Sequence, residues 1–217
     1  SMRHIAIVGM SFCGSTMLSH VLGAMKGVYN VGESFFIEHR DIFCNACGRD
    51  CEVLTPDLLA SLKQDRTNWY PRLAAQAKAE VLVSSDKNMD VLKRHDPEMD
   101  FDAVYCFRPP LEAHRSYARV KPPDHLDFEN YLCYWARFYS RAHYSFKVKG
   151  RKIWVDFSEF SRDPTGELAR LCAKLELPYE ESALEFWRVK QHAVGGNFNP
   201  YDALRDGKMD RITIRPR

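Results

Sequence analysis

The stretch Gly9-Met10-Ser11-Phe12-Cys13-Gly14-Ser15-Thr16 decides the fold of this chain. The apolar run from His4 to Val8 precedes it and predicts a strand, and the apolar spacing from Ser15 to Met25 predicts a helix after it. The two glycines have the G-x-x-x-x-G spacing of a phosphate-binding loop. Glycine lets the backbone curl so that N–H groups point inward, and the helix N-terminus adds partial positive charge. The stretch therefore predicts an anion site between a strand and a helix.

The residues of this loop limit which anion it can hold. Ser15 follows Gly14 where a loop that binds a nucleoside triphosphate needs a lysine, which disfavours an ATPase or a GTPase. A tight turn that holds no ligand is the alternative interpretation. If the loop binds a ligand, we expect the contacts to come from Ser11, Phe12, Cys13, Gly14, Ser15 and Thr16.

Outward from the loop, short apolar runs alternate with segments of helical spacing. Further strands are predicted at residues 28–31, 81–83, 104–107 and 153–155. Helices are predicted at about 57–64, 68–78, 111–120, 128–147, 165–175 and 180–190. This alternation predicts one α/β domain over residues 1–217, a three-layer, doubly wound structure with a mostly parallel sheet and a Cys-rich insertion at about 39–55.

The composition excludes several classes of protein. The net charge of +2 is too small for bulk attraction to nucleic acid or to an acidic membrane. No apolar run approaches the ~18 residues that span a bilayer, and no signal peptide is visible. Four of the seven cysteines are scattered in apolar surroundings, which fits a reducing compartment. We expect a cytoplasmic protein without nucleic-acid or membrane partners, and the oligomeric state stays open.

A second anion site is predicted where the strand at 104–107 ends. Arg108 follows that strand, and Ser116 lies eight residues later on a predicted helix. The carboxyl ends of parallel strands share one edge of a sheet, where ligands bind. The guanidinium fork and the hydroxyl could therefore meet on one phosphate. The alternative is that Arg108 is an ordinary ion-pair residue of a surface or an interface.

Together and in this order, the motifs resemble those of the sulfotransferase family that uses 3′-phosphoadenosine 5′-phosphosulfate (PAPS). The loop resembles the family's 5′-phosphosulfate loop, although Phe12 stands where relatives usually have Lys or Arg. Arg108 through Ser116 has the spacing of the 3′-phosphate motif. Further resemblances lie at Gly32-Glu33, at Asp86-Lys87-Asn88, at residues 156–160 with Asp163-Pro164, and at residues 192–197. The resemblance implies PAPS as co-substrate, adenosine 3′,5′-bisphosphate (PAP) as product, and Gly196 and Asn197 near the nucleotide.

The resemblance also implies roles for two charged side chains. The acceptor would be a hydroxyl or an amine of a small molecule, a carbohydrate or a peptide, and it must lose a proton. Glu33 is the expected base, and Lys87 is expected to stabilise charge on the bridging oxygen. Without the resemblance, Glu33 could equally be a loop acid or a helix cap, and Lys87 a surface lysine. His39 and His192 are reserve bases.

A cysteine cluster offers a third chemistry. Cys44, Cys47 and Cys51 have C-x-x-C-x-x-x-C spacing, which resembles a zinc knuckle. A fourth ligand must come from elsewhere, and His39 is the nearest candidate along the chain. A disulfide plus one free thiol, or three reduced thiols, are the other interpretations.

Two other functions compete with sulfuryl transfer. A P-loop kinase for a nucleotide or a small molecule could use Val81 to Asp86 as its magnesium-binding strand. A nucleotide-binding module with impaired catalysis is favoured by Phe12. Aromatic side chains that could face an acceptor, but that are more often core, occur at Trp69, Tyr70, Tyr131, Tyr134, Trp135, Phe138 and Tyr139.

Overall fold

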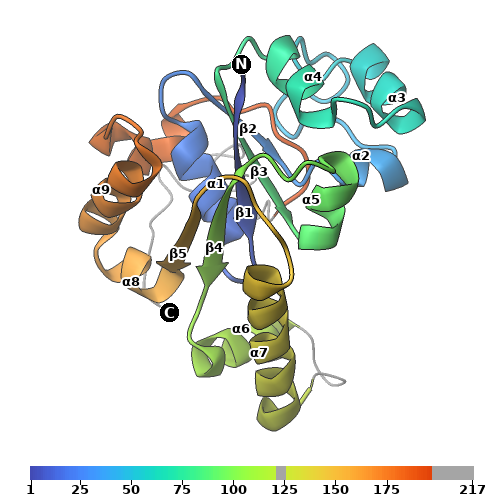
Figure 1. The fold of residues 1–217 in the computed structure, drawn as a ribbon. Helices are drawn as coiled ribbons and strands as arrows, with labels where there is room; N and C mark the ends of the chain where they lie inside the picture. Colours follow the sequence, from blue (N-terminus) through green and yellow to red (C-terminus); the bar gives the residue numbers. More distant parts are fainter. Residues whose placement is uncertain (121–125, 197–217) are drawn as a thin grey trace.

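The computed structural model describes residues 1–120 and 126–196 (Figure 1). Its centre is a five-stranded sheet with the order β2-β3-β1-β4-β5, in which every pair of neighbouring strands is parallel. The strands are β1 (Arg3–Val8), β2 (Val28–Gly32), β3 (Val81–Lys87), β4 (Asp102–Phe107) and β5 (Lys152–Asp156). All five lie where the sequence predicts them, and the α/β class is confirmed.

Helices connect and cover the strands. They are α1 (Ser15–Gly23), α2 (Phe36–His39), α3 (Pro56–Gln64), α4 (Trp69–Gln76), α5 (Met89–His95), α6 (Pro110–Val120), α7 (Phe128–Tyr144), α8 (Phe157–Arg162), α9 (Pro164–Leu175) and the 3-10 helix η1 (Glu181–Arg188). The prediction of an ordinary helix at 180–190 is wrong, because this segment forms a 3-10 helix with a kink at Glu185. The sequence reading missed α2, α5 and α8, which are too short to show a helical period.

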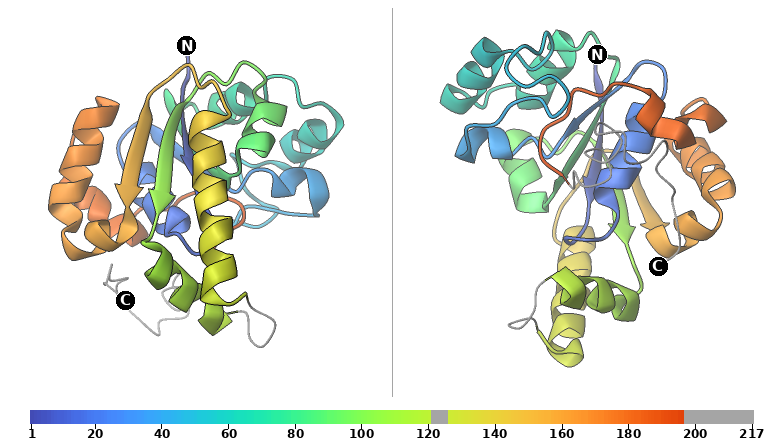
Figure 2. Two further views of the ribbon diagram at one scale, coloured as in Figure 1. Left: turned by 60° about the horizontal axis from the view of Figure 1, so that its bottom comes forward. Right: turned by 180° about the vertical axis from the view of Figure 1, so that it is seen from behind.

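Two layers of helices cover the two faces of the sheet (Figures 1 and 2). Successive residues of a strand point to opposite faces. Ile5 and Ile7 of β1 pack with the apolar sides of α1, α9 and η1, whereas Ala6 and Val8 pack with those of α3, α4, α5 and α7. Burial on both faces is typical of a parallel sheet. The predicted three-layer arrangement is therefore confirmed.

The topology places a crevice at the carboxyl ends of β1 and β4. β1 lies in the centre of the sheet, between β3 and β4. The chain leaves β1 through α1 toward β2, but it leaves β4 through α6 and α7 toward β5, on the other side of the sheet. Ligands of doubly wound sheets bind where neighbouring connections diverge in this way. Because Val8 pairs with Tyr105, the residues after both strands lie together at this point.

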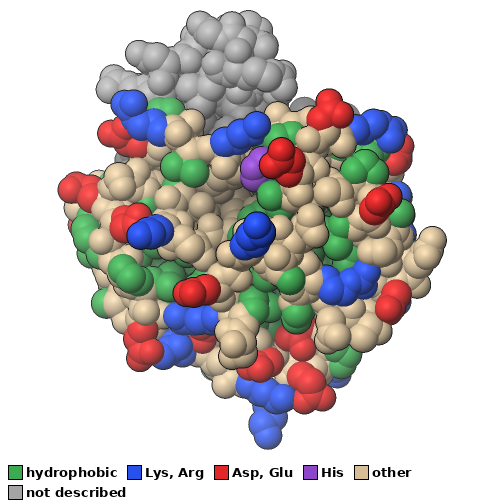
Figure 3. All heavy atoms as spheres, turned by 90° about the horizontal axis from the view of Figure 1, so that it is seen from above, with side chains coloured by type: hydrophobic (Ala, Val, Ile, Leu, Met, Phe, Trp, Pro, Cys, Tyr) green, Lys and Arg blue, Asp and Glu red, His purple; other side chains and the backbone are tan. Residues whose placement is uncertain are grey.

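The surface carries mixed charges. On the described part of the face in Figure 3, Lys and Arg side chains are interspersed with Asp and Glu side chains. Among residues 1–120 and 126–196, no helix is long and apolar enough to cross a membrane.

Candidate active site

The loop between β1 and α1 has the predicted strand-loop-helix geometry. Gly14 is the N-cap of α1 with φ +95°, and Phe12 also has a left-handed backbone with φ +67°. The Cys13 N–H donates to the Met10 carbonyl at 3.2 Å and closes a turn. A Cβ on Gly14 would lie 2.3 Å from the ring of Phe157. The loop therefore needs glycine at position 14, both for its backbone angle and for space.

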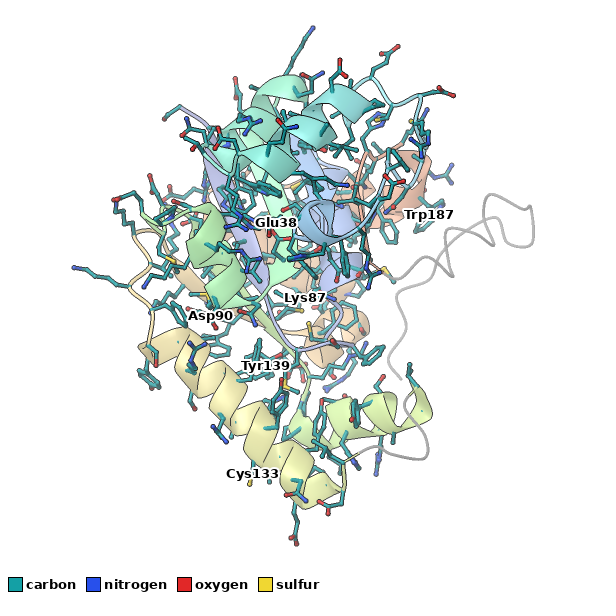
Figure 4. The ribbon with its side chains drawn as sticks, turned by 90° about the vertical axis from the view of Figure 1, so that its right-hand side faces the viewer. Glu38, Lys87, Asp90, Cys133, Tyr139 and Trp187 are labelled. Atoms are coloured by element: carbon teal, nitrogen blue, oxygen red, sulfur yellow. The ribbon has the colours of Figure 1, made fainter. Side chains whose placement is uncertain are left out.

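Helix α7 holds the loop from outside through one hydroxyl. The Tyr139 hydroxyl accepts a hydrogen bond from the Met10 N–H at 3.1 Å and donates to the Cys106 carbonyl at 2.8 Å. In Figure 4, Tyr139 lies toward the middle of the molecule, whereas the exposed Cys133 lies toward the outer end of α7. Tyr139 is buried, as its place in an aromatic stripe predicts, but its hydroxyl also fixes the loop.

A pocket of about 520 Å³ opens beside the loop. Most of the residues that line it fall into three groups: the start of the loop, a charged pair, and an aromatic wall at α2, α6 and α7. The lining residues are Gly9, Met10, Ser11, Phe12, Glu33, Phe35, Phe36, Asp86, Lys87, Asn88, Tyr117, Leu126, Tyr131, Tyr134 and Phe138. This volume lies in the range of small-molecule sites.

The charged pair consists of Glu33 and Lys87, the two residues that the sequence reading singled out for catalysis. Their side chains form an ion pair. Glu33 is buried, and its Oε2 accepts a hydrogen bond from the Gly196 N–H at 2.8 Å. Lys87 has φ +64°, and its carbonyl accepts from the Gly9 N–H at 3.1 Å, which ties it to the loop. Non-glycine residues with such backbones cluster at functional sites, and both Phe12 and Lys87 line this pocket.

Asp86 positions the turn that carries Glu33, a role that the sequence reading missed. Its carboxylate accepts hydrogen bonds from the Ser34 hydroxyl at 2.7 Å, the Tyr70 hydroxyl at 2.6 Å and the Phe35 N–H at 3.0 Å. Burial raises the pKa of Asp86 to about 6, although the hydrogen bonds from Tyr70, Ser34 and Phe35 oppose the shift. Trp69 donates from Nε1 to Ser34 Oγ at 3.0 Å. Trp69 and Tyr70 are thus core residues rather than acceptor surface.

Arg108 and Ser116 lie outside this pocket. The Arg108 guanidinium carbon is 4.9 Å from the centre of the Phe157 ring, the ring that also abuts Gly14. Arg108 is therefore on the Phe157 side of the loop. Ser116 is buried on α6. A joint grip of Arg108 and Ser116 on one phosphate stays a prediction.

The cysteine cluster meets a histidine from the far end of the chain. The ligand atoms of Cys44, Cys47, Cys51 and His192 all lie within 4.8 Å of one another. The expectation that His39 completes the cluster is wrong, because His39 is exposed and its Nε2 lies 3.6 Å from Glu38. No sequence signal marks His192 as a partner of the cysteines, because the contact depends on the chain returning to the edge of the sheet.

The returning segment reaches the phosphate loop as well. A Cβ on Gly196 would lie 3.0 Å from the Thr16 side chain, so Gly196 is close to the loop. Its contact with the nucleotide stays a prediction. Asn197 lies outside the described residues. Neither reserve base, His39 or His192, lines the pocket.

Comparison with solved structures identifies proteins of the same architecture. The sulfotransferase domain of the Synechococcus PCC 7002 olefin synthase aligns with 100% of this chain and 86% of its own, with a TM-score of 0.64 and 19% identity. The sulfotransferase domain of the curacin biosynthetic pathway aligns with 88% of this chain and 79% of its own, with a TM-score of 0.63 and 17% identity. A sulfotransferase from Mycobacterium tuberculosis covers 85% and 70%, with a TM-score of 0.50 and 14% identity.

Sequence comparison adds nothing to this likeness, since no protein-family profile and no curated protein sequence matches the chain. At identities this low, the structural likeness establishes a shared fold and nothing more specific. The strand order, the loop after β1 and these structural neighbours agree with one another. The chain has the fold of the sulfotransferase domains, as the order of its motifs predicted.

Proposed function

We propose that this protein transfers a sulfuryl group from PAPS to a hydroxyl group of an apolar acceptor. The observation that carries the proposal is the pocket in which residues 9–12 of the loop, the Glu33–Lys87 pair and an aromatic wall face one another. In this assignment residues 11–16 of the loop hold the 5′-phosphosulfate, and Arg108 and Ser116 hold the 3′-phosphate. The sulfotransferase fold supports the proposal.

Glu33 would act as the base of the transfer. Its Oε2 is held by the Gly196 N–H, which leaves Oε1, the partner of Lys87, to take the proton of the acceptor hydroxyl. The acceptor oxygen then forms a bond to sulfur as the bond from sulfur to the bridging oxygen of PAPS breaks. The bridging oxygen leaves with PAP, and the proton stays on Glu33. Positioning and charge stabilisation dominate such in-line displacements.

Lys87 would supply the cation that the loop lacks at Phe12. Its carbonyl is bonded to the Gly9 N–H, and its side chain lines the same pocket as Phe12. An ammonium group at this place can stabilise negative charge that develops on the bridging oxygen. On this view Phe12 shapes the acceptor side of the pocket, and the charge comes from the neighbouring strand.

The walls of the pocket favour an aromatic or aliphatic alcohol over a sugar. Phe35, Phe36, Tyr117, Tyr131 and Phe138 line it. Rings of this kind bury apolar surface and stack on other rings, whereas a carbohydrate would need many polar partners. A small-molecule phenol or alcohol is therefore the proposed acceptor, rather than a carbohydrate or a peptide.

The kinase alternative meets two obstacles in the same site. The loop has Ser15 where a kinase loop has its lysine. Asp86, the candidate magnesium ligand, is buried and receives three hydrogen bonds from Ser34, Tyr70 and Phe35. Both observations favour a sulfuryl donor over a nucleoside triphosphate.

The cellular location rests on the cysteines. All seven are free thiols in the structure. Free thiols persist in reducing compartments. The cytoplasm is therefore the proposed location.

Comparing the thermal shifts produced by PAP and by ADP tests the donor. We expect PAP to raise the melting temperature and ADP with magnesium to raise it little, because the loop and Arg108 would grip the two phosphate ends of PAP. A larger shift with ADP and magnesium would overturn the assignment. PAP binding without turnover over a broad panel of phenols, alcohols and sugars would instead support the impaired nucleotide-binding module.

A further inference from the structure

The four ligand atoms of the cysteine cluster lie close enough together to share one metal ion. His192 Nδ1 lies 3.3 Å from Cys51 Sγ, 3.4 Å from Cys47 Sγ and 3.7 Å from Cys44 Sγ. The bond lengths of zinc place a sulfur and a nitrogen ligand about 3.6 Å apart at a tetrahedral angle. Cys44 and Cys51 are buried, which keeps water from their sulfurs. Three thiolates and one imidazole favour zinc over magnesium or calcium, which prefer oxygen ligands.

The backbone around the cluster holds its sulfurs in place. Cys51 Sγ accepts a hydrogen bond from the Leu54 N–H at 3.2 Å. Gly48 has φ +63° and donates its N–H to the Cys44 carbonyl at 2.8 Å, which closes the turn. Hydrogen bonds of this kind orient metal ligands. These bonds hold the cysteine turn together from within the backbone.

The segment that carries His192 also carries the group that holds Glu33. Val194 adds to the sheet beside β2: its N–H donates to the Val31 carbonyl at 3.0 Å, and its carbonyl accepts from the Glu33 N–H at 2.8 Å. Two residues further on, the Gly196 N–H donates to Glu33 Oε2 at 2.8 Å. One short segment thus connects the cysteine cluster to the carboxylate in the pocket.

A second set of bonds joins this segment to the cysteine turn. Asn45 lies between two of the ligands and donates its N–H to the Ala193 carbonyl at 2.9 Å. Its side chain donates from Nδ2 to the Gly195 carbonyl at 3.0 Å. Tyr29 donates to the His192 carbonyl at 2.8 Å. A metal that fixes the cysteine turn would therefore fix residues 192–196 as well.

We propose that Cys44, Cys47, Cys51 and His192 bind one zinc ion, which fastens residues 192–196 against β2 and so positions Glu33. The ion is structural, because all four of its ligands come from the protein. Only the importance of Glu33 for transfer rests on the proposed function. Zinc binding and the link to residues 192–196 do not depend on it.

Zinc content tests the ligand set. We expect about one zinc per chain in protein purified under reducing conditions, from the four-ligand rule for structural sites. His192→Ala should weaken zinc retention against a chelator by more than about 100-fold, beyond the effect of losing an outer-shell partner. His192→Cys keeps four ligands and should retain zinc. His39→Ala is the matched control and should behave as the wild type.

Several outcomes would overturn the site. Reduced protein reconstituted with Zn²⁺ that holds no zinc is one, and equal retention in His192→Ala and the wild type is another. A disulfide between two of the three cysteines in native protein, detected by mass after alkylation, would also exclude it. Cobalt spectra of the wild type and His192→Cys should show tetrahedral thiolate coordination even if His192→Ala fails to fold.

Hydrogen exchange tests the link to Glu33. Removal of zinc should accelerate amide exchange in residues 193–196, while the amides of α9 should stay unchanged. Unchanged exchange in residues 193–196 would overturn the positioning role. Failure of the proposed function would look different, since zinc would be bound and residues 193–196 protected while PAP produced no thermal shift.

Discussion

The two halves of the candidate active site are built in opposite ways. The phosphate loop is one uninterrupted stretch, Gly9 to Thr16. The surroundings of Glu33 are assembled from four segments: residues 32–34, 44–51, 86–87 and 192–196. The loop depends on glycine angles and on a helix end that lie in one short sequence, whereas the assembly depends on contacts between residues more than a hundred positions apart. Apart from changes at Tyr139 and Phe157, which contact the loop, the first should tolerate changes elsewhere in the chain, and the second should respond to them.

The largest expected effect comes from removing the proposed base, Glu33, which should lower kcat without weakening the binding of PAP. Glu33→Gln removes the proton acceptor but leaves an amide oxygen for the Gly196 N–H. We expect kcat to fall about 10²- to 10⁴-fold, as for loss of a general base. The affinity for PAP, measured by calorimetry, should stay within about twofold, well under the tenfold of 1.4 kcal/mol. A variant with full kcat would show that Glu33 is not the base.

Substitution of Arg108 should instead weaken the binding of PAP. Arg108→Ala removes a guanidinium on the loop side of the site, beside Phe157. Loss of a charged partner costs about 2–4 kcal/mol, so PAP should bind about 30- to 1,000-fold more weakly. Arg115→Ala is the matched control, since Arg115 is an exposed arginine on α6 next to Ser116. Equal PAP affinities of the two variants would remove Arg108 from the site.

The two halves also differ in what the sequence could reveal. The strands and the loop could be predicted from the sequence, because each is marked by a local period or motif. Glu33 and Lys87 were singled out by the resemblance, but their ion pair was not predicted. The link between His192 and the cysteines could not be predicted, and neither could the support that Asp86 gives to Ser34. Such contacts are set by how distant segments return to one edge of the sheet, which no local period encodes.

Two glycines, Gly14 and Gly27, can separate the cost of backbone strain from the cost of crowding against the Phe157 ring. Gly14→Ala forces a side chain into a left-handed backbone and against the Phe157 ring, 2.3 Å away. We expect the free energy of unfolding to fall by about 2–4 kcal/mol, from strain together with overpacking. Gly27→Ala is the control, because Gly27 has φ +77° but nothing within 4 Å of its added Cβ, so only strain, about 1–2 kcal/mol, remains. Equal losses in denaturant unfolding would show that Phe157 yields to the extra methyl group.

The smallest expected effect concerns Asp86, the buried carboxylate that supports the surroundings of Glu33. Burial raises the pKa of Asp86 from 3.8 to about 6. Between these values the folded protein keeps a proton that the unfolded chain has lost, so the contribution of Asp86 to the free energy of unfolding falls as pH rises through this window. The fall is at most about 3 kcal/mol. Asp86→Asn should not show it, because an asparagine side chain does not titrate.

The measurement is urea unfolding of the wild type and of Asp86→Asn at several pH values from 4 to 6.5. The titration of other groups cancels in the difference between their free energies of unfolding. The wild type should lose stability relative to the variant as pH rises. Asp90→Asn is the control with the opposite sign, since Arg141 lowers the pKa of the exposed Asp90 and its small contribution is lost as pH falls. A constant difference between the wild type and Asp86→Asn would mean that Asp86 ionises near its ordinary pKa. The hydrogen bonds from Ser34, Tyr70 and Phe35 would then balance the effect of burial, and the turn that carries Glu33 would be held by an ordinary charged carboxylate.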